Sequence, residues 1–207
     1  RCEDAGTPAQ ALLERGRGLA AAGEWQLAME IFEKAVEADP AYAEGWAYLG
    51  EARQQTRASG GGEELEKAAA LDEESLAVKG LRALYFRRAG KFEEAVSLIA
   101  EAAEQAPQEP SWQVEWANTL AESGDLAGAL EHYNLANQID PRNGDNLYLL
   151  ARFCLAYHME IRETGLPAAR AGASLEPVNP RWPDLLGSIF MALGDPDLAE
   201  RSFRQAL

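Results

Sequence analysis

Few side chains in this sequence have the type and spacing that metal binding or catalysis needs. Cys154 and His158 stand four residues apart, which is a spacing that places two ligands on one face of a helix. A zinc site requires three or four convergent ligands, and no further cysteine or histidine is in register with these two. The chain has only two histidines, which leaves little material for a catalytic triad. We therefore expect no catalytic site, no metal site and no cofactor.

Pairs of adjacent carboxylates are plentiful, and they do not change that expectation. Glu63-Glu64, Glu73-Glu74 and Glu93-Glu94 lie at expected helix starts or on solvated faces, where the helix dipole already accounts for acidic residues. The sequence contains no phosphate-binding glycine loop followed by Lys-Ser or Lys-Thr, and no Gly-x-Ser-x-Gly motif. General acid–base catalysis has no support in the sequence.

One segment is unusual in its charge. Between Lys79 and Lys91 the chain carries five basic residues and no acidic one, although the formal net charge of the protein is −15. Arginine binds a carboxylate through two parallel hydrogen bonds, so such a segment suits aspartate, glutamate or a peptide C-terminus. The alternative is that these cations balance carboxylates on neighbouring helices.

Overall charge and hydropathy exclude several classes of partner. The chain has 19 Lys and Arg against 34 Asp and Glu, so binding to nucleic acid or to an anionic membrane works against repulsion. No stretch reaches the roughly 18 apolar residues of a membrane span. The N-terminus has neither an apolar signal core nor a starting Met, which is typical of an excised or processed segment. A cytoplasmic location is slightly favoured, and an exported or periplasmic location stays open. The two distant cysteines form no disulfide framework.

The strongest pattern in the chain is a repeat of about 34 residues. Successive intervals between Pro40, Pro107, Pro141 and Pro177 are 67, 34 and 36 residues. A series of alanines, separated by 33, 34, 34 and 70 residues, keeps the same period: Ala35, Ala68, Ala102, Ala136 and Ala206. A fixed period of this length predicts a solenoid, in which stacked units bury a core and leave an extended binding surface.

Each unit has the pattern of a helical hairpin. In residues 111–141, apolar residues recur at helical spacing on both sides of Gly124-Asp125. Gly124 can adopt the positive φ of a helix C-cap, and Asp125 can cap the next helix. Ala129 and Ala136 are small where two helices approach closely, and Tyr133 fills the space between them. Two antiparallel helices joined by a tight turn are therefore expected.

The second unit carries a recognisable family signature. Trp46-Ala47-Tyr48-Leu49-Gly50 has the W-x-x-L-G opening of the tetratricopeptide repeat, and the A-x-x-x-F and terminal Pro of that repeat follow in other units. The sequence resembles a tetratricopeptide repeat protein from Thr7 to Leu207. This resemblance implies an all-α fold, a right-handed superhelical solenoid of helix-turn-helix repeats, with a concave groove lined by the first helix of each repeat. The repeats are expected to form a single array of about six: residues 9–42, 43–75, 76–109, 110–143, 144–179 and 180–207.

Two units depart from the pattern. In the second, the glycines at 60–62 stand where the second helix should begin, so we expect that helix to start late, near Glu63, after a flexible loop. In the fifth, the spacing is two residues longer. There we expect an elongated first helix from about Asp145 past His158, and a short second helix entered through Pro167.

The resemblance directs the functional prediction to the groove. If the family geometry holds, the groove contains three apolar or polar residues and four cations that could contact a partner: Leu84, Asn118, Tyr148, Arg87, Arg88, Arg152 and Arg181. We predict a non-enzymatic scaffold that binds a protein or peptide segment there, with an acidic peptide favoured by the arginines. The carboxylate clamp found in some members of the family is not present, because Val114, Leu149 and Leu185 occupy three of its five roles.

Two other functions stay open. The chain stops before the last repeat's terminal proline, so its final apolar surface could pack on another copy, which would make the protein a self-assembling structural array. The chain could also be a substrate-positioning array excised from a larger enzyme. The sequence does not identify the partner, the pathway or the oligomeric state.

Overall fold

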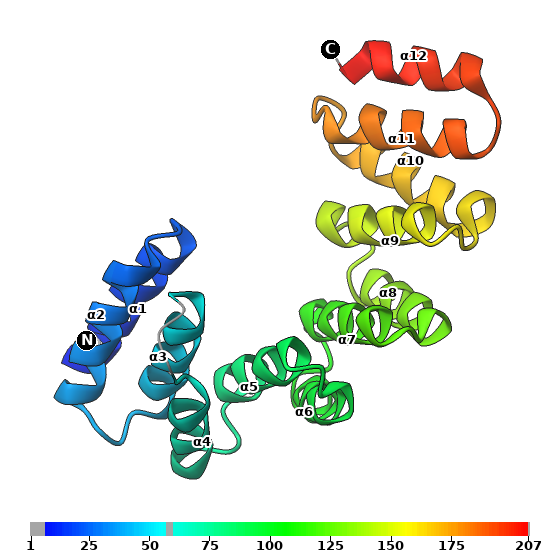
Figure 1. Ribbon diagram of the computed structural model, residues 1–207. Helices are drawn as coiled ribbons and strands as arrows, with labels where there is room; N and C mark the ends of the chain where they lie inside the picture. Colours follow the sequence, from blue (N-terminus) through cyan, green and yellow to red (C-terminus); the bar gives the residue numbers. More distant parts are fainter. Residues whose placement is uncertain (1–6, 57–59, 207) are drawn as a thin grey trace, which may run out of the picture. The chain divides into compact units, whose positions relative to one another are not determined.

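The computed structural model describes residues 7–56 and 60–206 of the 207-residue chain. These ranges contain twelve α-helices, a π-helical segment and no β-strand, so the expected all-α fold is confirmed (Figure 1). The chain divides into two compact units, residues 1–102 and 103–207, which we call the N-terminal unit and the C-terminal unit. In the N-terminal unit the helices are α1 (Pro8–Ala21), α2 (Trp25–Ala38), α3 (Ala43–Gln55), α4 (Gly62–Leu71), α5 (Leu76–Arg88) and most of α6 (Phe92–Gln105).

The C-terminal unit contains three further helical pairs. Its elements are α7 (Pro110–Ser123), α8 (Leu126–Ile139), α9 (Gly144–Ala156), η1 (Ile161–Gly165), α10 (Leu166–Leu175), α11 (Arg181–Ala192) and α12 (Pro196–Ala206). Helices α7 and α8 lie side by side, as do α11 and α12 (Figure 1).

The turn between α7 and α8 has the geometry that the sequence predicts. Gly124 has φ 93°, and the amide of Asp125 donates to the carbonyl of Leu120 at 2.9 Å, which closes the end of α7. The side chain of Asp125 then accepts from the amide of Gly128 at 3.0 Å and caps α8. Three other turns between paired helices place a glycine in the same left-handed conformation: Gly23, Gly90 and Gly194.

Small residues and aromatic rings alternate in the core of the C-terminal unit. Ala129 and Ala136 are fully buried, and Tyr133 is 5 % exposed, with its ring centroid 5.0 Å from that of Phe153 on α9. The sequence assigned these three residues of α8 to close packing, and their burial confirms it. In the N-terminal unit, Phe32 of α2 is likewise fully buried and lies 5.6 Å from the ring of Tyr48 on α3.

The first irregular repeat matches its prediction. Helix α4 begins at Gly62, one residue from the expected start, and its N-cap Gly61 has φ 96°. The carboxylate of Glu64 accepts from the amide of Gly61 at 2.8 Å, so the first turn of the helix fixes the preceding loop. Residues 57–59 of the expected flexible loop lie outside the described residues.

The second irregular repeat differs from its prediction. Helix α9 ends at Ala156, so the expected elongated helix past His158 is wrong. His158 takes a left-handed conformation with φ 54°, and the amide of Met159 donates to the carbonyl of Cys154 at 3.0 Å, which ends the helix. The extra residues are accommodated in this turn and in η1. The expected short second helix is observed as α10, which has Pro167 in its first turn.

Candidate functional site

A cavity of about 370 Å³ in the C-terminal unit brings two of the predicted groove residues together. Asn118 comes from the first helix α7, and Arg152 comes from the next first helix, α9. The residues that line the cavity are Asn118, Ala121 and Glu122 of α7, Tyr133 of α8, Leu149, Arg152, Phe153 and Ala156 of α9, and Tyr157. Two first helices and one second helix therefore build the site.

The amide of Asn118 has a fixed orientation in this cavity. The hydroxyl of Tyr133 donates to Oδ1 of Asn118 at 2.6 Å. This bond occupies the oxygen of the amide and leaves the two hydrogens on Nδ2 for another acceptor. Asn118 therefore presents a donor that the core residue Tyr133 positions.

Arg152 presents a cation on the same cavity. Its side chain is exposed, and its Cζ lies 5.7 Å from the centroid of the Tyr148 ring. In the part of the chain that the structure describes, its guanidinium forms no ion pair. A guanidinium with its hydrogen-bonding groups available can bind a carboxylate through two bonds.

The wall of the cavity is apolar and aromatic. The ring centroids of Phe153 and Tyr157 lie 4.9 Å apart, and Tyr157 is 44 % exposed. Leu149 and Ala156 complete this wall, while Glu122 is the acidic residue of the lining and is already engaged in an interaction. The site therefore combines a hydrogen-bond donor, a cation and an aromatic surface.

The sequence had assigned Tyr133 to packing alone, and it did not identify Phe153 or Tyr157 as site residues. A helix that continued past His158 would contain Tyr157, whereas Tyr157 is the residue at which α9 ends. The i, i+4 spacing of Phe153 and Tyr157 is the signal in the sequence that places their two rings side by side.

Arg181 lies at the start of α11 and is held by two carboxylates of its own unit. Its guanidinium donates to Asp145 at 2.6 Å and to Glu176 at 2.9 Å, and it also lies over the ring of Tyr148. Hydrogen bonds, first from Trp182 and then from Asn179, lower the pKa of Glu176, and Arg181 lowers it further. Arg181 and Tyr148 therefore lie together, with the charge of Arg181 internally compensated.

The remaining predicted residues lie in the N-terminal unit, on α5. Arg88 donates to both carboxylate oxygens of Glu51 on α3, at 2.7 and 2.9 Å, and the Glu51 side chain is only 6 % exposed. Leu84 and Arg87 are half-buried, and Arg87 is engaged in an interaction with another residue. Lys79, from the same basic segment, is buried and pairs with Glu74 and Glu101 at 3.1 Å each.

Two cations of the basic segment 79–91 balance carboxylates on neighbouring helices. Lys79 and Arg88 both pair with acidic residues of the same unit, as the second interpretation of this segment predicts. The carboxylate of Glu51 also accepts from Nε2 of Gln55 at 2.8 Å. A nearby cavity of about 520 Å³ is lined by Glu14, Arg17, Trp25, Tyr48, Glu51 and Leu81, among others. Its own cation, Arg17, is paired with Glu14 at 2.9 Å.

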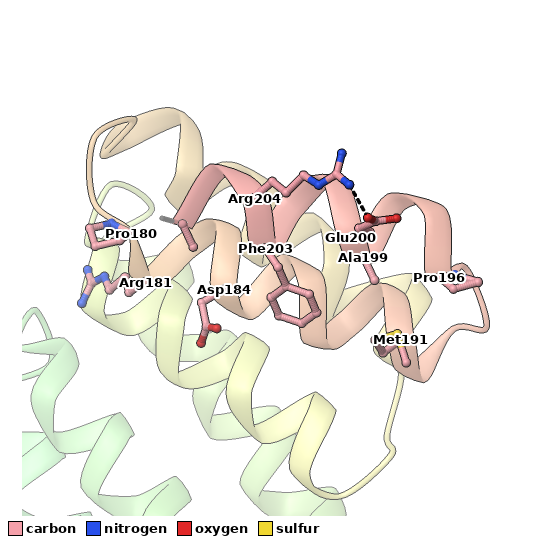
Figure 2. Close-up of a pocket in the computed structure, with 10 residues that line it drawn as sticks. Pro180, Arg181, Asp184, Met191, Pro196, Ala199, Glu200, Phe203 and Arg204 are labelled. Carbon is pink, nitrogen blue, oxygen red and sulfur yellow. Dashed lines mark hydrogen bonds and ion pairs between the residues drawn. The ribbon is translucent and has the colours of Figure 1, made fainter.

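A third cavity, of about 730 Å³, lies on α11 and α12 (Figure 2). Phe203 and Ala199 of α12 point toward α11, and Met191 of α11 is 57 % exposed. Glu200 and Arg204 form an ion pair along α12 at 2.5 Å. This cavity is more apolar in its lining than the one at Arg152.

Cys154 is a core residue of the C-terminal unit. The side chain is fully buried, and burial raises the pKa of its thiol to about 11, so the thiol is protonated at neutral pH. No group of three or more metal-ligating side chains occurs within residues 7–56 and 60–206. Among the helices of these same ranges, none is long and apolar enough to span a bilayer.

Models described as tetratricopeptide repeat match residues 81–144 and 184–207. The structure is similar to that of PilF from Pseudomonas aeruginosa, with a TM-score of 0.73 and 19 % identity over 94 % of this chain and 88 % of that one. It is also similar to PilW, described as a widely conserved type IV pilus biogenesis factor, with a TM-score of 0.79 and 16 % identity over 97 % of this chain and 93 % of that one.

A third similar structure is YrrB, described as a tetratricopeptide repeat protein with an unusual peptide-binding site. Its TM-score is 0.55, at 19 % identity over 83 % of this chain and 88 % of that one. At such identities the similarity shows the fold alone. No curated protein sequence matches the chain.

Proposed function

We propose that this chain, which matches tetratricopeptide repeat models at residues 81–144 and 184–207, is a non-enzymatic interaction module. It would bind a segment of a partner protein in the groove lined by its first helices. The observation that carries this proposal is the α7–α9 cavity, where Asn118 and Arg152 lie together beside an aromatic wall. The six repeats would act as one array, with Leu84, Arg87, Arg88, Tyr148 and Arg181 as further groove residues.

The chemistry of the cavity supports recognition rather than catalysis. Donors and aromatic rings converge there, while the buried thiol of Cys154 is protonated. Peptide binding is also consistent with the peptide-binding site described for YrrB, which shares the fold. Pockets with an apolar wall and a few convergent polar groups are typical of binding sites.

A peptide library tests the proposal directly. Phage that display random twelve-residue peptides are selected on the purified protein, and the enriched peptides are synthesised and titrated by fluorescence anisotropy. Ala121→Phe places a ring in the cavity, so it should lower the affinity at least tenfold. Ala127→Phe is the matched control, because Ala127 is exposed on α8 and does not line the cavity.

Circular dichroism and thermal unfolding establish that both variants remain folded. The proposal fails if no peptide is enriched on the wild-type protein, or if the enriched peptides bind Ala121→Phe and Ala127→Phe equally well.

A second candidate function is self-association through α12, and the cavity in Figure 2 favours it. The ring of Tyr133 on α8 packs against Phe153 of the next first helix, whereas Phe203, its counterpart on α12, lines an open cavity. A second copy placed on this face would bury Phe203 and Met191 of both chains.

The groove remains the better-supported site. Glu200 on α12 occupies the repeat position that the buried Leu130 has on α8, and its charge makes the α12 face less apolar and so less suited to a dimer contact. Light scattering after size exclusion tests the second candidate. Phe203→Asp should convert a dimer to a monomer, while Gln205→Asp on the exposed side of α12 should not. A monomeric wild-type protein at 100 µM would exclude this candidate.

A further inference from the structure

We infer that Arg152 and Asn118 form a subsite for the side-chain carboxylate of a peptide, and that Phe153 and Tyr157 hold an aromatic or aliphatic residue next to that acid. This inference rests on the proposed function and specifies the chemistry of the bound segment. It assigns a specific role to two of the predicted groove residues, both in the C-terminal unit.

Arg152 differs from two other predicted groove arginines in that its charge is available to a ligand. Arg88 and Arg181 are each bound to carboxylates of their own unit, so their charges are already compensated. Arg152 is exposed and is held over the Tyr148 ring, and it pairs with no carboxylate of the described residues. A cation–π contact restricts the guanidinium without neutralising it, because the ring carries no net charge.

The amide of Asn118 supplies a hydrogen-bond donor in the same cavity as Arg152. Asn118 and Arg152 are 34 residues apart, which is one repeat, so they occupy the same position on successive first helices. The Tyr133 hydroxyl holds Oδ1 of Asn118, and the amide hydrogens on Nδ2 are left to donate. A carboxylate, which only accepts hydrogen bonds, complements a guanidinium and an amide donor.

An apolar and aromatic wall lines the same cavity as these donors. Phe153 and Tyr157 present adjoining rings, and Leu149 and Ala156 extend the apolar surface. The volume of about 370 Å³ lies near the lower end of the range for ligand pockets, roughly 300 to 1,000 Å³, so the cavity accommodates one or two side chains. An acidic residue with an apolar neighbour would use both parts of the site.

The number of donors favours a side-chain carboxylate over a peptide C-terminus. The family's clamp for C-terminal carboxylates uses five polar residues, and Val114, Leu149 and Leu185 stand in three of those places here. The cavity offers one guanidinium and one amide, with Glu122 also in its lining, so it has fewer donors than such a clamp provides.

The charge of the whole protein affects how such binding depends on salt. The net charge of −15 repels an acidic segment at long range, and Arg152 attracts it within a Debye length of roughly 8 Å at physiological salt. Glu122 also lines the cavity and adds a nearby repulsion, and higher salt screens all three contributions. A carboxylate bonded to the guanidinium lies closest to Arg152, so that attraction is the largest contribution at contact distance. Affinity should therefore fall as the salt concentration rises.

Parallel selections test the inference. A phage library of random twelve-residue peptides, whose C-termini are blocked by fusion to the coat protein, is selected on the wild-type protein, on Arg152→Glu and on Arg142→Glu. Arg142 is the matched control, since it is exposed, makes the same charge change and does not line the cavity.

On the wild-type protein and on Arg142→Glu, the enriched peptides should carry Asp or Glu next to an aromatic or aliphatic residue. On Arg152→Glu, the selection should shift to Lys or Arg at that position. The wild-type peptides, synthesised with amidated C-termini, should lose at least tenfold in affinity on Arg152→Glu. They should lose less on Arg152→Lys, which keeps the charge and loses the two-bond geometry.

The results separate this inference from the proposed function. If the enriched peptides fail to bind Ala121→Phe but bind Arg152→Glu as tightly as wild type, the groove binds peptides and the carboxylate subsite is wrong. The subsite is also wrong if glutamine replaces the acidic residue without loss of affinity, or if only peptides with a free C-terminus bind. If no peptide is enriched on the wild-type protein, both proposals fail.

Discussion

The first helices α3 and α9 carry a charged residue at the same repeat position, and the two residues have opposite fates. Glu51 on α3 has a side chain that is 6 % exposed, and it accepts bonds from Arg88 and Gln55. Arg152 on α9 is exposed and touches the ring of Tyr148. Position in the repeat therefore does not determine whether a charge is available to a partner; the residues on the adjacent helices determine it.

The neighbouring first helix accounts for this difference within each unit. On α5, which follows α3 by one repeat, Arg88 reaches back to Glu51 with two hydrogen bonds. On α11, one repeat beyond Arg152, the residue at the position of Arg88 is Ala192. An alanine offers no charge to compensate Arg152, and the Arg152 side chain is exposed.

The largest effect on this comparison should come from removing Arg88. Arg88→Ala removes the cation from the buried carboxylate of Glu51, which keeps its bond from Gln55, and loss of one charged partner of this kind costs about 1 to 3 kcal/mol. Arg152→Ala removes an exposed charge and should change the free energy of unfolding by less than about 0.5 kcal/mol. Urea unfolding of both variants measures this. Equal losses would show that Glu51 is as well solvated as Arg152.

A double substitution should give a smaller effect. Glu51→Leu combined with Arg88→Leu replaces the ion pair by apolar groups, which is often nearly neutral for a buried pair. We expect the double variant to recover all but about 1 kcal/mol of wild-type stability, because no charge is left buried and unpaired. The same urea titration measures it. A double variant as unstable as Arg88→Ala would mean that the shape of the pair, and not its charge, holds α3 and α5 together.

Much of this architecture could be predicted from the sequence, because the repeat encodes it locally. Gly124 predicts a helix C-cap, Asp125 predicts an N-cap, and the small residues of α8 predict a close helix contact. The structure contains all three features. The ion pair between Glu51 and Arg88 joins residues 37 positions apart, and no repeat rule specifies it.

The end of α9 was also beyond a sequence rule. A glycine marks four of the turns between paired helices, but His158 takes the same left-handed conformation without being a glycine. The consequence for the site is direct, since Tyr157 lines the cavity at the point where α9 ends.

Exchanging the left-handed residues of two turns, Gly124 between α7 and α8 and His158 after α9, should have an intermediate effect. A non-glycine residue in the left-handed conformation costs roughly 1 kcal/mol, so His158→Gly should stabilise the protein by about that amount. Gly124→His, the reciprocal change at φ 93°, should destabilise it by about 1 kcal/mol. Thermal unfolding reports both. If His158→Gly lowers the melting temperature, contacts of the imidazole hold the turn that shapes the cavity.

The smallest effect concerns pH and His132 of α8. The ring of His132 stacks on Trp116 at 4.1 Å, and its Nδ1 lies 2.7 Å from Oε1 of Gln113. Burial lowers the pKa of His132 below its usual value of about 6.5. A lowered folded pKa means that the contribution to stability is complete above about pH 6.5 and is lost as the pH falls through the folded pKa.

His132→Gln should therefore flatten the decline in stability below pH 6.5, which urea unfolding at several pH values measures. Peptide affinity at the Arg152 cavity should stay constant between pH 6 and 8, because arginine and carboxylates keep their charge there. A binding curve that follows the titration of a histidine would place a second titrating group at the cavity.

Cys154 offers a way to time the motions of this unit. Its side chain lies so close to the backbone of η1 that a Cβ added at Gly165 would be 2.8 Å from the Cys154 Cβ. A protonated, enclosed thiol reacts with an alkylating reagent only after α9 and η1 separate. In a Cys2→Ser background, the labelling rate at pH 8 therefore counts openings of this one hairpin, and a bound peptide that bridges α7 and α9 should make those openings rarer.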